Sequence, residues 1–533
     1  GLSFYVDAGG NNYSNDDVTW THNHQIWNQN HRATSPTWNG YRYDVRQLWE
    51  IKRGKRYVLK GNIFEGNWSF QNNGPSIFLS GRPTYTLADL NVGISDILIR
   101  SNTIRHASSG WTCAGGGIPP DSVTVQRVLF ENNFLHDINR YVYDDGGPSF
   151  SSSYMDALPG CQDMTIRHNT MGLALGRAPW LMLIGGGSML GGKLTYTDNI
   201  VYMSFGEAGG AIGVDDTQYV DSHPRLPAVV SNGTVKQKLD SYFVKLGATV
   251  QPNYSFTNNV IIGGMTGTSM STLRSLTSSE VSSLASQFPP GNIFPVGSTI
   301  AEREQQVGMV NPSESAYRLT ENSPYRARGT NPSLSGKSIG ADFDQLSADQ
   351  GRVLGINIQP GSTALEVNYI APDGRACSVD TKPASGTDWR RVTDPGGARP
   401  RTLIVNALTP STSYQYRILC YFPQLNDGGS ITGLGPDEIT EGKISTTDLS
   451  NETVAYTITG ATPDSLPQGP VLLQYGTGSD VSQQQGPVPY NANGYEFTLQ
   501  WLKGTALYYR IAYLDTANNP IGATTAAQAV IVR

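Results

Sequence analysis

Apolar and polar positions follow one short pattern through the first half of the chain: apolar, any, apolar, any, any, Asn, any, apolar. The pattern occurs seven times, around these asparagines: Asn23, Asn62, Asn102, Asn133, Asn169, Asn199 and Asn259. Successive asparagines are 39, 40, 31, 36, 30 and 60 residues apart. Repetition at such spacings is typical of solenoids, in which each repeat forms one coil.

The pattern also indicates what each repeat forms. Apolar residues two apart lie on one face of a strand, and asparagine readily turns the chain. Strands stacked about 4.8 Å apart would align the asparagine side chains into a hydrogen-bonded ladder. We therefore predict a parallel β-solenoid over residues 1–347, with helical stretches near residues 235–246 and 271–288. An ordinary β-sandwich would not explain why the asparagine always follows the same apolar pair.

The pattern changes from about residue 351 to short alternating strands separated by turn signals, as in β-sandwiches. We predict an all-β chain with three domains: the solenoid (1–347) and two β-sandwiches (351–447 and 449–533).

Two segments carry a family resemblance. They are LWEIKRGKRYVLKGNIFEGNW (residues 48–68) and YRLTENSPYRARGTNPSLSGKSIGADFDQL (residues 317–346). The coils resemble secreted bacterial members of the pectate-lyase-like superfamily of right-handed parallel β-helices, and residues 317–346 resemble their closing segment. The resemblance implies an extracellular protein whose grooves bind polysaccharide. Because the chain begins inside what resembles a coil, we expect self-association through this solenoid end or through the C-terminal strand.

A second resemblance lies in ALTPSTSYQYRILCYF (residues 407–422). It resembles the fibronectin type III pattern in which a Leu-x-Pro turn precedes a corner tyrosine, here Tyr414, whose hydroxyl would bond back to the turn. Cys377 and Cys420 should lie on neighbouring strands, so we predict a disulfide between them, with two buried thiols as the alternative. Whether Cys113 and Cys161 pair stays open.

Composition limits the function. Charged residues are 15% of the chain, the net charge is −6, and no run of Lys and Arg occurs, which argues against nucleic acid or an anionic membrane as partner. No apolar run approaches the ~20 residues of a membrane span. Four sparse cysteines without C-x-x-C spacing fit disulfides in an oxidising compartment. We predict no cofactor and no metal site, with calcium as the one metal to consider.

A polar stripe is the first candidate site. The third position after the ladder asparagine gives Glu65, Arg105 and His136, and the position two before it gives Lys60, Arg100, Glu131 and Arg167. Such a stripe could bind a glycan, with Arg or His as base and Glu as acid. The alternative is cross-strand charge pairing on a solvated face.

Paired aspartates are the second candidate: Asp144 with Asp145, and Asp215 with Asp216. Two carboxylates could serve as acid and base or bind calcium, but Asp-Gly loops are also ordinary turns. Neither aspartate pair matches the superfamily's catalytic motifs residue by residue. We therefore expect an extracellular non-catalytic structural or adhesive protein, such as a surface or filament subunit that contacts glycans. The alternative is a polysaccharide lyase or glycoside hydrolase acting on an extended polysaccharide.

Overall fold

The computed structural model describes residues 16–27, 31–35, 38, 40–41, 47–68, 75–81, 93–114, 125–143, 155–157, 161–172, 174–175, 182–185, 192–205, 212–215, 233–245, 251–267, 272–312, 316–330, 337–350, 357–369, 376–394, 401–425, 431–446, 453–460, 466, 469–477, 481–489, 494–525 and 527–532. The chain divides into two compact units. Unit 1 comprises Gly1–Val353 and Pro423–Gly435, and unit 2 comprises Leu354–Phe422 and Pro436–Arg533. The boundaries of the three domains drawn from the sequence stay a prediction.

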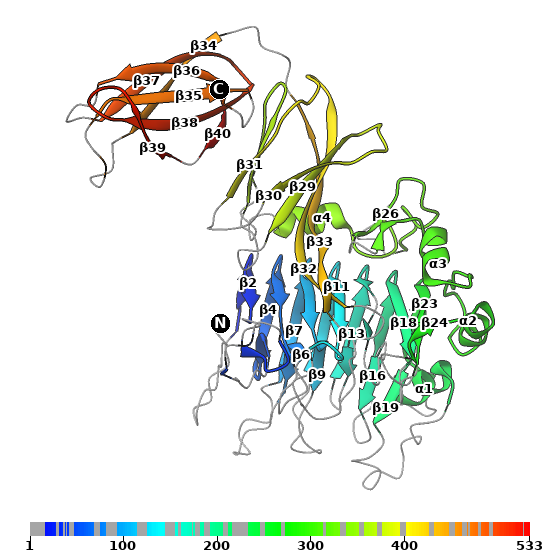
Figure 1. Cartoon of the computed structure of the whole chain (residues 1–533). Coiled ribbons are helices and arrows are strands. Elements are labelled where there is room, and N and C mark those ends of the chain that lie inside the picture. The colour runs from blue at the N-terminus through cyan, green and yellow to red at the C-terminus, as the bar shows by residue number, and fades with distance from the viewer. Residues whose placement is uncertain are drawn as a thin grey trace, which may run out of the picture. The chain divides into compact units, whose positions relative to one another are not determined.

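Three parallel sheets form the body of unit 1 (Figure 1). The first sheet contains β1 (Thr19–Thr21), β4 (Gly54–Lys60), β7 (Ile94–Arg100), β10 (Val125–Glu131), β13 (Cys161–Arg167), β17 (Leu194–Thr197) and β22 (Tyr254–Thr257). The second contains β2 (His24–Ile26), β5 (Ile63–Glu65), β8 (Thr103–Ala107), β11 (Phe134–Asn139), β14 (Thr170–Met171), β15 (Ala174–Leu175), β18 (Ile200–Phe205), β23 (Val260–Thr266) and the antiparallel β24 (Arg274–Ser275). The third contains β3 (Trp49–Ile51), β6 (Pro75–Ser80), β9 (Ser109–Ala114), β12 (Met155–Ala157), β16 (Met182–Gly185) and β19 (Ile212–Asp215).

Neighbouring strands in each sheet come from successive repeats, so equivalent residues stack in columns. Lys60 pairs with Arg100, Arg100 with Glu131, and Glu131 with Arg167 in the first sheet. Alternate side chains of the strands enter one apolar core that runs through the stack, for example Leu59, Ile99 and Phe130. This continuous burial fixes the register, because a one-residue slip would turn the apolar set outward.

Helices and short hairpins occur along the chain in the C-terminal part of unit 1. They are α1 (Val235–Tyr242), α2 (Ser278–Ala285), α3 (Ile300–Val307) and α4 (Phe343–Gln350), with the hairpins β20 (Val244–Lys245)–β21 (Gln251–Pro252) and β25 (Met309–Asn311)–β26 (Ala316–Leu319). The first three helices begin at threonine capping boxes, which satisfy free backbone N–H groups. The helices expected near residues 235–246 and 271–288 are therefore confirmed, in shorter form.

The residue before each ladder asparagine has left-handed backbone geometry, with φ between 52° and 65°. We call these residues the turn column: His22, Gly61, Ser101, Asn132, His168, Asp198 and Asn258. One consequence is that their side chains leave the coil at the same place in every repeat, beside the ladder. His22 and His168, the two histidines of the column, are therefore turn residues.

The closing segment of unit 1 runs back along the turn column. We call residues 328–330 and 337–350 the strap. Its contacts follow the column in reverse order: Asn258 Nδ2 donates to Arg328 O (3.2 Å), Thr330 N to Asp198 Oδ1 (2.9 Å), His168 Nδ1 to Ser338 O (3.0 Å), and Asp342 N to Asn132 Oδ1 (2.6 Å). At the C-terminal end of the strap, a Cβ on Gly61 would lie 2.6 Å from Asp349 O, so glycine lets α4 approach the coil.

The strand registers that the structure describes in unit 2 are antiparallel. Its first core lies between a sheet of β27 (Asn357–Pro360), β28 (Leu365–Tyr369) and β31 (Arg401–Val405) and a sheet of β30 (Arg390–Asp394), β29 (Cys377–Pro383), β32 (Ser413–Leu425) and β33 (Ile431–Ser445). Its second core lies between β34 (Thr453–Gly460) with β37 (Tyr495–Leu502) and a sheet of β36 (Gln483–Val488), β35 (Val471–Gly476), β38 (Ala506–Leu514), β39 (Pro520–Thr524) and β40 (Gln528–Ile531). The C-terminal strand β40 therefore already pairs with β38.

Two local predictions for residues 377–420 are confirmed. Cys377 and Cys420 form a disulfide across the β29–β32 register pair. Tyr414 is buried, and its hydroxyl accepts a hydrogen bond from Thr409 N (2.9 Å), as expected for a corner tyrosine. Cys113 and Cys161, whose pairing the sequence left open, form a second disulfide inside unit 1.

Candidate functional site

The ladder asparagines are bonded to one another through the stack. The backbone N and side-chain Nδ2 of each donate to Oδ1 of the next, for example from Asn102 to Asn133 at 2.9 and 3.1 Å. The column continues to Asn292, which accepts two bonds from Asn259 and which the repeat pattern missed. Asn292 follows a Pro-Pro-Gly turn and has no apolar pair before it, so the sequence pattern carried no signal for it.

Glu65, Arg105 and His136 stand side by side in the second sheet, as their register requires. The expectation that they lie on a solvated face is wrong, because their exposed fractions are 2%, 2% and 1%. Glu65 accepts from Arg105 Nε (3.1 Å) and Nη2 (2.9 Å) and contacts His24 Nε2 (2.9 Å). Burial alone would raise the pKa of Glu65, but Arg105 and the bond from His24 hold this pKa well below its usual value.

For His136, aromatic rings beside it contribute to this burial, one of them from a distant segment. The ring of His136 stacks on Phe134 and lies beside Tyr317 of β26, with ring centroids 4.5 and 6.5 Å away. The sequence could not show this, because Tyr317 lies 181 residues beyond His136. The Glu65 carboxylate is bound by buried Arg105, and its pKa is strongly lowered. Such a carboxylate is a poor general acid near neutral pH.

A second polar group adjoins these residues and contains an imidazole–carboxylate pair. His106 Nδ1 donates to Asp137 Oδ2 (2.7 Å), and the Tyr143 hydroxyl donates to the same oxygen (2.5 Å). His106 and Asp137 have φ of 51° and 48°, and the His106 and His136 ring centroids are 5.7 Å apart. Burial would raise the pKa of Asp137, but the bonds from His106 and Tyr143 hold it below its usual value.

This arrangement orients the His106 ring through its Nδ1 atom, as a carboxylate does for a general base. Burial, together with the Asp137 charge, raises the pKa of Tyr143 well above its ordinary value, so the phenol stays protonated. Sequence reasoning did not select these three residues as a set. The only available signal was the adjacency of His106 and Asp137 to two selected positions.

The first-sheet stripe is a column of ion pairs. Glu131 is fully buried and binds Arg100 on one side and Arg167 on the other, with the Arg167 bond at 2.6 Å. Lys60 binds Asp349 of α4 at 3.0 Å. The side chains of Lys60, Arg100 and Arg167 are 37%, 37% and 23% exposed, so only Glu131 departs from the predicted solvated position.

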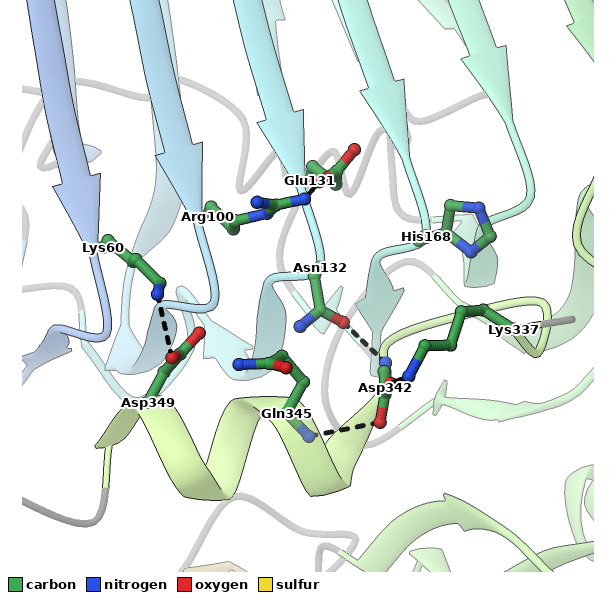
Figure 2. Close-up of a pocket in the computed structure, with 9 residues that line it drawn as sticks. All are labelled: Lys60, Arg100, Glu131, Asn132, His168, Lys337, Asp342, Gln345 and Asp349. Atoms are coloured by element: carbon green, nitrogen blue, oxygen red, sulfur yellow. Dashed lines mark hydrogen bonds and ion pairs between the residues drawn. The ribbon is translucent and has the colours of Figure 1, made fainter. Parts of the chain in front are cut away.

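A cavity of about 290 Å³ lies between this stripe and the strap (Figure 2). Lys60, Arg100, Glu131, Asn132 and His168 form its coil wall, and Lys337, Asp342, Gln345 and Asp349 form its strap wall. Asp342 caps α4 by accepting from Gln345 N (3.2 Å) and also binds Lys337. Burial lowers the pKa of His168, against the opposing charge of Asp198, so the neutral ring is favoured.

The paired aspartates stay untested. Asp144, Asp145 and Asp216 lie outside the described residues, and Asp215 ends β19 without a described side chain. Among the residues that the structure does describe, no group of three or more His, Cys, Asp or Glu could hold a metal ion. Calcium binding by these loops therefore stays a prediction. No helix in the described part of the chain is long and apolar enough to cross a membrane.

Comparisons with known proteins add little. No protein-family model matches the chain, and no curated protein matches it. Two solved chicken structures are similar to it: the FN1–FN3 domains of CNTN1 (16% identity, TM-score 0.14, 33% of this chain and 66% of that chain) and a segment of two fibronectin type-III domains from tenascin (14% identity, TM-score 0.14, 33% of this chain and 97% of that chain). At these TM-scores the likeness carries no argument about the fold or function of this chain.

Proposed function

We propose that the chain is an extracellular, non-catalytic structural or adhesive protein, a surface or filament subunit that contacts glycans. In this proposal unit 1 is a right-handed parallel β-helix, and unit 2 is a pair of fibronectin type III-like modules. Two intrachain disulfides support an oxidising, extracytoplasmic location.

One observation carries the non-catalytic part of the proposal. Glu65, the acid of the first candidate set, is 2% exposed and is held by Arg105 and His24. Glu131 likewise forms ion pairs with both Arg100 and Arg167. Both carboxylates therefore hold neighbouring coils together, and neither is presented to a substrate as an acid or base.

Incubation of the purified chain with neutral and acidic polysaccharides tests the proposal. We expect no new reducing ends and no unsaturated products, together with ordered assembly by electron microscopy and light scattering, or retention on a glycan surface. Depolymerisation by the chain would overturn the proposal, as would a strictly monomeric chain that adheres to nothing.

The second candidate function is a carbohydrate-active enzyme, either a polysaccharide lyase or a glycoside hydrolase. It is favoured by the His106–Asp137–Tyr143 group, which has the geometry of an oriented base beside a protonated phenol. An enzyme would lose depolymerising activity in His106→Ala while keeping its unfolding transition. If activity survives this substitution, the His106–Asp137–Tyr143 group is not the active site.

A further inference from the structure

The cavity beside α4 is built from two parts of the chain that are far apart in sequence. Its coil wall comes from residues 60–168 and its strap wall from residues 337–349. Besides lining the cavity, the walls are joined directly by the Lys60–Asp349 ion pair and by the Asp342 N to Asn132 Oδ1 bond. The cavity therefore exists only while the strap is docked on the turn column.

The charges of the lining cancel. Three cations (Lys60, Arg100 and Lys337) face three carboxylates (Glu131, Asp342 and Asp349), so the sum is zero with His168 neutral. Each cation is already paired with one of these carboxylates. An ion entering the cavity would lose hydration without meeting a compensating net charge, so the lining favours a neutral ligand.

The lining nevertheless has unused hydrogen-bonding capacity. The Gln345 side chain is exposed, and its amide makes no hydrogen bond to any described residue. Arg100 is 37% exposed and uses only Nη2, on Glu131, among the described residues. Asp349 Oδ2 is buried and has no hydrogen-bond partner in the described part of the chain, whereas its Oδ1 binds Lys60. The site thus offers spare donors (Arg100, Gln345) and spare acceptors (Gln345, Asp349).

We propose that this cavity binds one neutral polyhydroxylated unit, a sugar ring or polyol, and that its binding stabilises the docked strap. The inference rests on the proposed glycan-contacting function and names the ligand class and the place. Hydroxyl groups both donate and accept, so one ligand satisfies Arg100, Gln345 and, after a small rotation of the carboxylate, Asp349. The volume of about 290 Å³ suits a single ring and lies at the small end of ligand pockets.

Coupling to the strap follows from the two-walled construction. A ligand that touches Arg100 on a coil and Gln345 on α4 binds the docked state better than the undocked state. It therefore shifts the docking equilibrium by its differential affinity. Occupancy should raise the protection of residues 337–350 against amide hydrogen exchange.

The test uses the full chain with glucose, galactose, mannose and N-acetylglucosamine, and with galacturonate and sulfate as charged counterparts. Saturation-transfer NMR and hydrogen exchange of residues 337–350 are the two readouts. Gln345→Ala should weaken binding of the neutral sugar about 3- to 10-fold, the worth of one neutral hydrogen bond. It should leave thermal unfolding unchanged, because Gln345 is exposed. The matched control is Gln305→Ala, an exposed glutamine on α3 away from the cavity.

Saturable binding of a neutral sugar that Gln345→Ala weakens and Gln305→Ala does not, with added protection of the strap, supports the proposal. No saturable binding, equal or tighter binding of galacturonate or sulfate, or indifference to Gln345→Ala would overturn it. If the chain assembles or adheres but binds none of these sugars, the sugar-binding inference is wrong and the proposed function is not affected. Cleavage of a polysaccharide would instead overturn the proposed function.

Discussion

Two adjacent positions in every coil of unit 1 show opposite behaviour. The ladder position is asparagine in each of the seven repeats, and each asparagine bonds to the next through the same two hydrogen bonds. The turn-column position just before it shares one backbone geometry but holds Gly, Ser, Asp, two His and two Asn.

This difference in residue variability follows from the neighbours that each position contacts. A ladder asparagine faces copies of itself, so its identity follows from the repeat. From Gly61 to Asn258, the turn column meets a different part of the strap in each coil, so Gly61 admits α4 and Asp198 receives Thr330. The same contrast exists for charges: the Glu65–Arg105 pair is buried, whereas the Asp96–Arg127 pair is exposed.

The largest effect is expected at the buried charge pair. Glu65→Gln leaves Arg105 as a buried cation without its counter-ion, which should lower the free energy of unfolding of unit 1 by about 3–5 kcal/mol. Because the folded pKa of Glu65 is lowered, its contribution is present above its unfolded pKa of about 4.3 and is lost as pH falls through the folded value. Urea unfolding from pH 7 to pH 3 should show the wild-type advantage shrinking; a pH-independent difference would contradict the assignment.

Next comes the ladder. Asn133→Ala removes the acceptor for Asn102 N and Nδ2 and the donor to Ile99 O and Asn169 Oδ1, all inside the core. Leaving such buried groups without partners should cost about 2–4 kcal/mol in urea unfolding. A loss of stability no larger than that caused by Asn132→Gly, in the turn column, would contradict the distinction between the two columns.

Gly61→Ala should act on the strap more than on the coils. The added Cβ would meet Asp349 O at 2.6 Å, and the residue has φ of 65°, so strain and displacement together should cost about 2 kcal/mol. Hydrogen exchange should accelerate in residues 343–350, while β7 and β10 keep their protection. Uniform acceleration through the coils would show that α4 and the stack unfold as one.

Asn132→Gly is the gentler probe of the turn column. Glycine keeps the left-handed backbone but loses the acceptor for Asp342 N, so the expected cost is about 1 kcal/mol. The measurement is again strap exchange together with urea unfolding. An effect as large as that of Asn133→Ala would mean that the two columns contribute alike.

The smallest effect is expected at the exposed pair. Arg127→Gln breaks the bond to Asp96 (2.6 Å), in which the side chains are 51% and 39% exposed. Water and salt screen such a pair, so the loss should stay below about 0.5 kcal/mol and vanish in high salt. Thermal unfolding at low and high salt checks this, and a large salt-independent loss would contradict it.

Sequence and structure agree where neighbours are copies of one motif. The pattern predicted the asparagine column, because each asparagine stands at the same offset from an apolar pair, and the structure places bonds along it. It predicted Cys377–Cys420 because the two cysteines were expected on neighbouring strands, and the structure pairs them. It failed at Glu65, Arg105 and His136, which are buried, and the ring of His136 lies beside Tyr317 from the closing segment.

The sequence by itself determined the periodic part of this protein: parallel strands, ladder asparagines and the β-strands of the C-terminal part of the chain. These follow from local alternation and turn chemistry, which act over a few residues and repeat. Only the tertiary structure decided which polar residues are buried, that Cys113 pairs with Cys161, and that a cavity lies beside α4. Those outcomes depend on the strap lying against coils up to 288 residues earlier in the chain, as between Gln350 and Asn62, and no local pattern encodes that contact.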